Sequence, residues 1–218
     1  MRAKTRRLYK KVMHSYSLGF GFREPYQFLL DASFCKQAAD NKLDIQKDLD
    51  SALSSITKPM VTECVIRELQ KQGEHGVAAV AKKFEVHKCK HKTAETSAKC
   101  ILSLIDKTHR NNYGVATQDD SLRDPLHAIP GVPIIKVKNS MLILEPMSQA
   151  SKQVVQKGEM EKTMPSASEA KRLNIQRPEA TDMVHKKRKA KAPNPLSMKK
   201  KKKTAPPPPK KKKTSHPM

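Results

Sequence analysis

The chain of 218 residues has little of what membrane proteins and disulfide-rich proteins need. Its apolar runs fall far short of the roughly 18–20 residues of a membrane-spanning helix, so an integral membrane protein is excluded. No apolar stretch follows the basic N-terminus, and we therefore expect no secretory signal. With only 4 Cys in a chain rich in His and Lys, a disulfide scaffold is not expected and a reducing compartment is.

Aromatic and acidic residues are scarce toward the C-terminus. No Phe or Tyr follows Tyr113, and residues 151–218 hold 20 Lys and Arg against 5 Asp and Glu. Such a segment buries too little apolar surface to offset the entropy lost on ordering, while runs of lysine and four consecutive prolines favour an extended chain. We therefore expect residues 149–218 to be a disordered Lys/Pro-rich tail.

The tail contains two basic clusters that are typical of a nuclear or nucleolar targeting signal and of non-specific phosphate binding. They consist of Lys186, Lys187, Arg188 and Lys189, and of Lys199, Lys200, Lys201, Lys202 and Lys203. Because the whole chain has a net charge of +23, a nucleic acid is the first partner to expect. The alternative is a tail that only confers solubility.

Residues 1–22 form a second basic segment, since the first acidic residue is Glu24. Gly19 and Gly21 predict a flexible arm and not one continuous helix. Aromatic side chains alternate with the basic ones, so the arm is expected to bind RNA by phosphate contacts and base stacking. The alternative is that the aromatic side chains pack on the domain. The RNA-binding residues expected are Arg2, Lys4, Arg6, Arg7, Lys10 and Lys11.

Between the basic segments, strands and helices are predicted to alternate. Short apolar runs predict strands at 26–30, 59–61, 113–116, 132–135 and 141–144, and helical patterns cover 32–41, 44–53, 63–70, 77–84 and 93–108, with a short helix from 117. This alternation predicts an α/β domain over residues 23–148, with a central, mostly parallel sheet flanked by helices. Ligands of such sheets bind beyond the carboxyl ends of the strands.

Carboxylates follow two of these strands. Asp31 ends the first strand, Asp119 follows strand 113–116, and Glu68 lies on a helix that can face the same crevice. Three carboxylates in that position can hold Mg²⁺ or Mn²⁺ for phosphodiester hydrolysis. The alternative is that these strand-end aspartates cap the helices that follow.

A second candidate site lies within residues 84–100. Three potential ligands alternate along an extended segment, so they share one face, and a fourth follows on the next helix. The ligands expected are His87, Cys89, His91 and Cys100. Thiolate and imidazole ligands make a closed, structural zinc site. The alternative is a solvated basic loop with Cys100 in the core; Cys35 and Cys64 are expected to pack in the core.

Several segments together resemble the family of PIN-like rRNA-processing proteins. They are REPYQFLLDASFC (23–35), VATQD (115–119) with Leu122, PGVP (130–133), and APNPLS (192–197) shortly before five lysines. The resemblance implies a PIN-like domain in the nucleus and nucleolus. It also implies a role in the small-subunit processome in early pre-18S rRNA processing, with pre-18S rRNA, box H/ACA snoRNA and other processome proteins as partners.

The resemblance also bears on both sites. Active PIN nucleases place four acidic residues around a divalent metal; Asp31, Glu68 and Asp119 match three positions and the fourth has no match. This implies a remnant acidic cluster without Mg²⁺ or Mn²⁺, and binding in place of cleavage. A metal-dependent endoribonuclease acting on pre-rRNA is the alternative, and a zinc-dependent protein adaptor is a third possibility.

The family's zinc motif has the ligand order Cys, Cys, His, Cys. Cys89, His91 and Cys100 match the last three positions, whereas Phe84 stands at the first and cannot bind a metal. We expect His87 to substitute for that ligand.

Overall fold

The computed structural model describes residues 3–89, 91, 95–105, 112–165 and 172. The basic clusters at 186–189 and 199–203, and Arg2, lie outside them. The chain divides into two units, Met1–Pro165 and Ser166–Met218, and all the elements below belong to the first. No helix in the described part of the chain is long and apolar enough to cross a bilayer.

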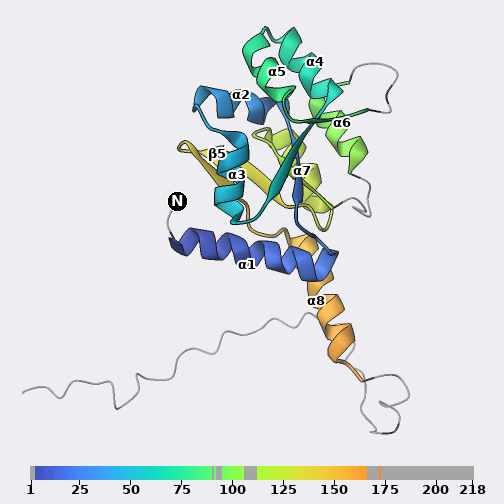
Figure 1. The fold of residues 1–218 in the computed structure, drawn as a ribbon. Coiled ribbons are helices and arrows are strands. Elements are labelled where there is room, and N and C mark those ends of the chain that lie inside the picture. The colour runs from blue at the N-terminus through green and yellow to red at the C-terminus, as the bar shows by residue number, and fades with distance from the viewer. Residues whose placement is uncertain (1–2, 90, 92–94, 106–111, 166–171, 173–218) are drawn as a thin grey trace, which may run out of the picture. The chain divides into compact units, whose positions relative to one another are not determined.

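The first unit is a six-stranded sheet with helices packed on its faces (Figure 1). The strands are β1 (Tyr26–Leu30), β2 (Thr57–Thr62), β3 (Glu85–His87), β4 (Tyr113–Ala116), β5 (Ile134–Lys138) and β6 (Met141–Leu144). The helices are α1 (Ala3–Phe20), α2 (Ala32–Asp40), α3 (Ile45–Leu53), α4 (Glu63–Lys71), α5 (His75–Ala81), α6 (Ser97–Leu104), α7 (Asp120–Ala128) and α8 (Gln149–Thr163). The predicted α/β class is therefore confirmed.

The strand order β3-β2-β1-β4-β5-β6 fixes where a ligand can enter. All neighbouring pairs are parallel except β5 and β6, which are antiparallel. The chain leaves β1 toward β2 on one side and returns to β4 on the other, so the direction of winding reverses between β1 and β4. In open α/β sheets, ligands bind at the carboxyl ends of the strands that flank such a reversal.

Alternation along β1 divides the interior into two cores. Phe28 and Leu30 point into the larger core, under α1 to α5, while Leu29 points into the smaller one, under α6 and α7. All three side chains are fully buried. Cover on both faces of this central strand explains why its sequence is apolar at every position except Gln27.

The predicted flexible arm is wrong, because residues 3–20 form the single helix α1. Tyr9, Met13 and Tyr16 recur at helical spacing and are buried against the domain. The Tyr16 hydroxyl donates to the Val132 carbonyl at 3.3 Å, and burial raises the pKa of Tyr16 to about 12. The aromatic side chains therefore pack on the domain, which was the alternative, and the basic ones lie on the exposed side.

The expectation of disorder from residue 149 onward is also wrong for its first part, which forms α8. Ser148 caps this helix by accepting from the Ser151 backbone N–H at 3.2 Å. Ser151 is fully buried and accepts from the Gly131 N–H at 2.9 Å. A few buried hydrogen bonds at its first turn thus hold a helix whose composition is polar.

Candidate functional site

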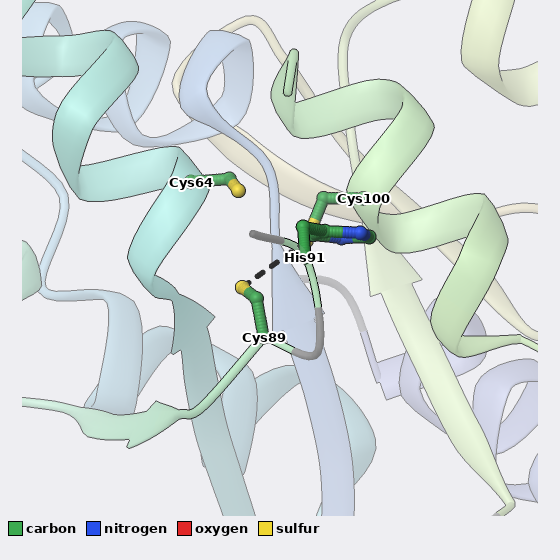
Figure 2. Close-up of side chains that lie close together, drawn as sticks. All are labelled: Cys64, Cys89, His91 and Cys100. Carbon is green, nitrogen blue, oxygen red and sulfur yellow. Dashed lines mark hydrogen bonds between the residues drawn. The ribbon is translucent and has the colours of Figure 1, made fainter. Parts of the chain in front are cut away.

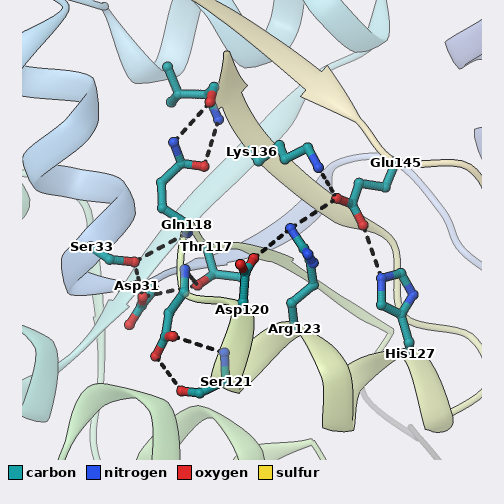
Figure 3. Close-up of polar contacts among 12 residues, drawn as sticks. Asp31, Ser33, Thr117, Gln118, Asp120, Ser121, Arg123, His127, Lys136 and Glu145 are labelled. Carbon is teal, nitrogen blue, oxygen red and sulfur yellow. Dashed lines mark hydrogen bonds and ion pairs between the residues drawn. The ribbon is translucent and has the colours of Figure 1, made fainter.

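The carboxyl ends of β1 and β4 bring Asp31 close to the residues that follow β4 (Figure 3). Asp31 is 2% exposed, and its Oδ2 accepts hydrogen bonds from the hydroxyls of Ser33 and Thr117, the latter at 3.0 Å. Its Oδ1 is buried and has no hydrogen-bond partner among the described residues. Although Asp31 precedes α2, its side chain does not cap that helix. This carboxylate therefore keeps one oxygen free at the point where ligands are expected.

Thr117 connects Asp31 to Asp119. The Thr117 hydroxyl donates to Asp31 and accepts from the Asp119 backbone N–H at 3.1 Å. The Asp119 carboxylate caps α7, accepting from the Ser121 N–H at 2.9 Å and from the Ser121 hydroxyl at 2.7 Å. Two of the three predicted acidic residues thus lie at one edge of the sheet, and one of them also serves as a helix cap.

Glu68, the third predicted acidic residue, has hydrogen-bond partners of its own. Its carboxylate accepts from the Ser97 backbone N–H at 2.6 Å and from the Gln72 side chain at 3.3 Å, so it holds the start of α6 against α4. Within the described residues, no metal-sized group unites it with Asp31 and Asp119. Asp120, which directly follows Asp119, forms an ion pair with Arg123 at 2.8 Å.

The second candidate site is a cluster of three thiols and one imidazole (Figure 2). One potential ligand atom from each side chain lies within 4.8 Å of all the others, and the sulfur atoms of Cys89 and Cys100 are 3.3 Å apart. Tetrahedral ligands around zinc, with Zn–S near 2.3 Å, lie about 3.8 Å apart, so the cluster has the size of such a site. Its members are Cys64, Cys89, His91 and Cys100.

The pKa values of two thiols in the cluster shift in opposite directions. Burial raises the pKa of the Cys100 thiol. Burial acts on Cys89 in the same direction, but hydrogen bonds from the Cys64 backbone and the Cys100 thiol outweigh it and lower the pKa of Cys89. Metal ligands must be thiolates, and a bound divalent cation supplies the charge that stabilises them. The donor set fits a structural metal ion.

The structure brings together three of the four predicted ligands and replaces the fourth. His87 ends β3 with its ring against that of Tyr113, the ring centroids 6.2 Å apart, and is not in the cluster. Cys64 takes its place. Because β2 and β3 are parallel with Thr62 opposite His87, the residue two positions beyond each partner lies at the same edge, and these residues are Cys64 and Cys89. Sequence spacing gives no sign of this pairing.

A buried carboxylate that the sequence did not single out ties α7 to the last two strands. Glu145 is 8% exposed and forms ion pairs with Lys136 at 2.5 Å, His127 at 3.1 Å and Arg123 at 3.7 Å (Figure 3). These contacts fix α7, whose first residue follows Asp119. The ion pairs of Glu145 therefore help to hold α7, and with it Asp119, at the acidic edge.

Comparisons with known proteins agree with this geometry. The Fcf1 family matches residues 51–146, and a UTP23 sensor motif matches residues 185–203. The chain is similar to the rRNA-processing protein utp23 of Schizosaccharomyces pombe, with 41% identity over 91% of this chain and 87% of that protein. It is also similar to the human rRNA-processing protein FCF1 homolog, with 32% identity over 56% of this chain and 63% of that one.

Among solved structures, the chain is similar to the PIN domain endonuclease Utp24. The two share 30% identity with a TM-score of 0.51, over 57% of this chain and 94% of that chain. Fold and acidic edge together define a PIN-domain protein. Within that class, the identity along almost the whole length shows that the chain belongs to the Utp23 family of rRNA-processing proteins.

Proposed function

We propose that the chain acts in early rRNA processing by binding RNA, not by cutting it. The partners proposed are pre-18S rRNA, box H/ACA snoRNA and other proteins of the small-subunit processome in the nucleolus. The observation that carries this proposal is the hydrogen bonding of Glu68, which accepts from the Ser97 N–H; among the described residues, no third carboxylate joins Asp31 and Asp119 in one metal-sized group. The four-carboxylate arrangement that the resemblance implies for an active PIN nuclease is therefore incomplete among the described residues, which favours binding over metal-assisted hydrolysis of a phosphodiester.

The exposed face of α1 is the proposed RNA-contacting surface of the described unit. Lys4, Arg7 and Lys11 follow one another at steps of three and four, so they share one face of the helix. This face is opposite the one that Tyr9 and Tyr16 bury. Since the buried face fixes the helix on the domain, the charges are held in a row that can neutralise successive phosphates.

The cluster of Cys64, Cys89, His91 and Cys100 is the proposed site of a structural Zn²⁺. An ion there would join α4, the segment after β3 and α6. Four protein ligands complete a tetrahedral shell and leave no position for a substrate, so such an ion stabilises the fold and does not activate water.

A metal-dependent endoribonuclease is the second candidate, and one observation favours it. The free, buried Oδ1 of Asp31 is the type of atom that a divalent cation would accept as a ligand. A nuclease of this kind needs Asp31 and Asp119 as carboxylates and loses its activity when either becomes an amide.

Incubation of the full-length protein with Mn²⁺ and a precursor 18S RNA separates the two candidates. We expect the RNA to be bound and to stay intact. Cleavage by the wild type that disappears in Asp31→Asn and Asp119→Asn, but persists in the control Asp40→Asn, would overturn the binding proposal. Asp40 is an exposed residue at the far end of α2 and provides the same change of charge.

A further inference from the structure

A polar cleft lies at the opposite end of the sheet from Asp31 and Asp119. It has a volume of about 360 Å³ and is lined by Gly21, Arg23, Pro25, Gln27 and Asn112. Arg23 and Pro25 precede β1, and Asn112 precedes β4, so the cleft opens beside the amino ends of the two central strands. It is separate from both candidate sites described above.

The walls of the cleft are held in place before any ligand arrives. Phe22 and Tyr26, on either side of the Arg23–Pro25 turn, are both buried, and the Phe22 ring packs edgewise against Tyr16 with centroids 5.6 Å apart. The Asn112 side-chain amide donates to the Gly21 carbonyl at 3.2 Å and so joins the two sides. A preformed cleft avoids the cost of ordering its walls on binding.

The chemistry of the lining is that of an anion site with additional donors. Arg23 is exposed and forms no ion pair with any described residue, and none of the described residues that line the cleft is acidic. The Gln27 side chain is half-buried beside it and makes no hydrogen bond within the described residues. A guanidinium binds phosphate oxygens in a two-point contact, while a carboxamide both donates to and accepts from the edge of a base.

We infer that this cleft binds one nucleotide of single-stranded RNA, with its phosphate on Arg23 and its base or ribose edge on Gln27. The inference rests on the RNA-binding function proposed above and adds a place and a ligand class to it. The volume falls within the range of about 300–1,000 Å³ typical of small-ligand sites. Gly21 has a φ of +73°, and among the described residues no atom beyond its chain neighbours lies within 4 Å of the point that a Cβ would occupy there, so the ligand can approach the backbone.

The test is the binding of a 5′-fluorescein-labelled, mixed-sequence 12-nucleotide RNA to the full-length protein, measured by fluorescence anisotropy between 50 and 300 mM KCl. We expect Arg23→Gln to weaken binding roughly fivefold to tenfold at 100 mM KCl. It should also lower the magnitude of the slope of log K against log[KCl] by about 0.7, because each neutralised phosphate of a single strand contributes about that much to the slope. Arg23→Lys should recover part of the affinity and the whole slope. Gln27→Leu should weaken binding with the slope unchanged, because it removes a contact that releases no counterion.

The matched control is Arg67→Gln, which removes the same charge from an exposed position on α4 that is paired with Glu63. It should change the affinity less than twofold. If Arg23→Gln behaves as Arg67→Gln does while the wild type binds, the cleft inference fails and the proposed function stands. If the wild type itself does not bind at 50 mM KCl, both fail. A 4-thiouridine RNA crosslinked to the wild type should label the peptide around 21–27, and crosslinks confined to other peptides would also overturn the inference.

Discussion

At the scale of single residues, the role of a cysteine depends on the side chains that the neighbouring strands and helices place beside it. Cys35 and Cys64 are both buried on helices that follow parallel strands, and in the sequence they look alike. Cys35 packs among apolar residues, where burial, with a smaller contribution from the charge of Asp31, raises its pKa to about 12 and keeps it a thiol. Cys64 lies near Cys89 because the register of β2 and β3 brings the two to the same edge, and Cys100 joins them from α6.

This difference makes the two cysteines a matched pair for testing the metal site. We expect Cys64→Ser to weaken zinc binding at least about a hundredfold, because a missing thiolate opens the tetrahedral shell and binding is coupled to folding. Cys35→Ser and His87→Ala should keep about one zinc per chain. Metal content by plasma mass spectrometry and competition with a chromogenic chelator measure both. Zinc retained in Cys64→Ser but lost in His87→Ala would restore the ligand set expected from the sequence.

At the scale of elements, the local sequence pattern predicts the helices and strands of the domain interior but not the helices at its two ends. The apolar run 26–30 and the capping residue Thr62 led directly to β1 and α4, since each is determined by near neighbours. The local sequence does not predict helices α1 and α8, because polar sequences such as theirs become ordered through a few long-range contacts. One of these is the close approach of Gly19 to Val155. The pairing of Cys64 with Cys89 likewise depends on the strand register, which composition does not contain.

The contact between β1 and β4 that positions the acidic edge depends on a glycine. Gly114 lies opposite Phe28 in the register, and a Cβ at this position would overlap with the Phe28 ring, which is fully buried. We expect Gly114→Ala to lower the free energy of unfolding by about 1–3 kcal/mol, as overpacked core positions do. Urea denaturation followed by circular dichroism measures this change.

Gly76→Ala is the control for this substitution. Gly76 lies within α5, and no described atom outside its own helix backbone and chain neighbours lies within 4 Å of an added Cβ, so the protein should gain roughly 0.5–1 kcal/mol of stability. In Gly114→Ala combined with Phe28→Leu, the smaller side chain should recover part of the loss. A Gly114→Ala protein as stable as the wild type would show that β1 and β4 can separate at this point, and the tight positioning of Asp31 beside Thr117 would then need another cause.

At the scale of the whole molecule, positive charge is divided unevenly between the two units. Residues 166–218 hold 17 Lys and Arg against 3 Asp and Glu, while residues 1–165 hold 27 against 18. In the first unit most carboxylates have structural partners, such as the ion pairs of Glu145 and the cap formed by Asp119. We therefore expect the first unit to select its RNA and the second to supply most of the attraction to phosphate.

Deletion of residues 166–218 tests this division, because the first unit keeps all of its described contacts. If the tail neutralises even five phosphates of a single-stranded RNA, its loss should lower the slope of log K against log salt by about 3.5 and weaken binding at 100 mM KCl by more than tenfold. Alanine in place of the four prolines 206–209 keeps every charge and should leave the slope unchanged. In cells, the truncated chain fused to a fluorescent reporter should leave the nucleolus, whereas the proline variant should remain there. An unchanged slope after the deletion would place the phosphate contacts on the first unit alone, with α1 and the Arg23 cleft as the surfaces left to supply them.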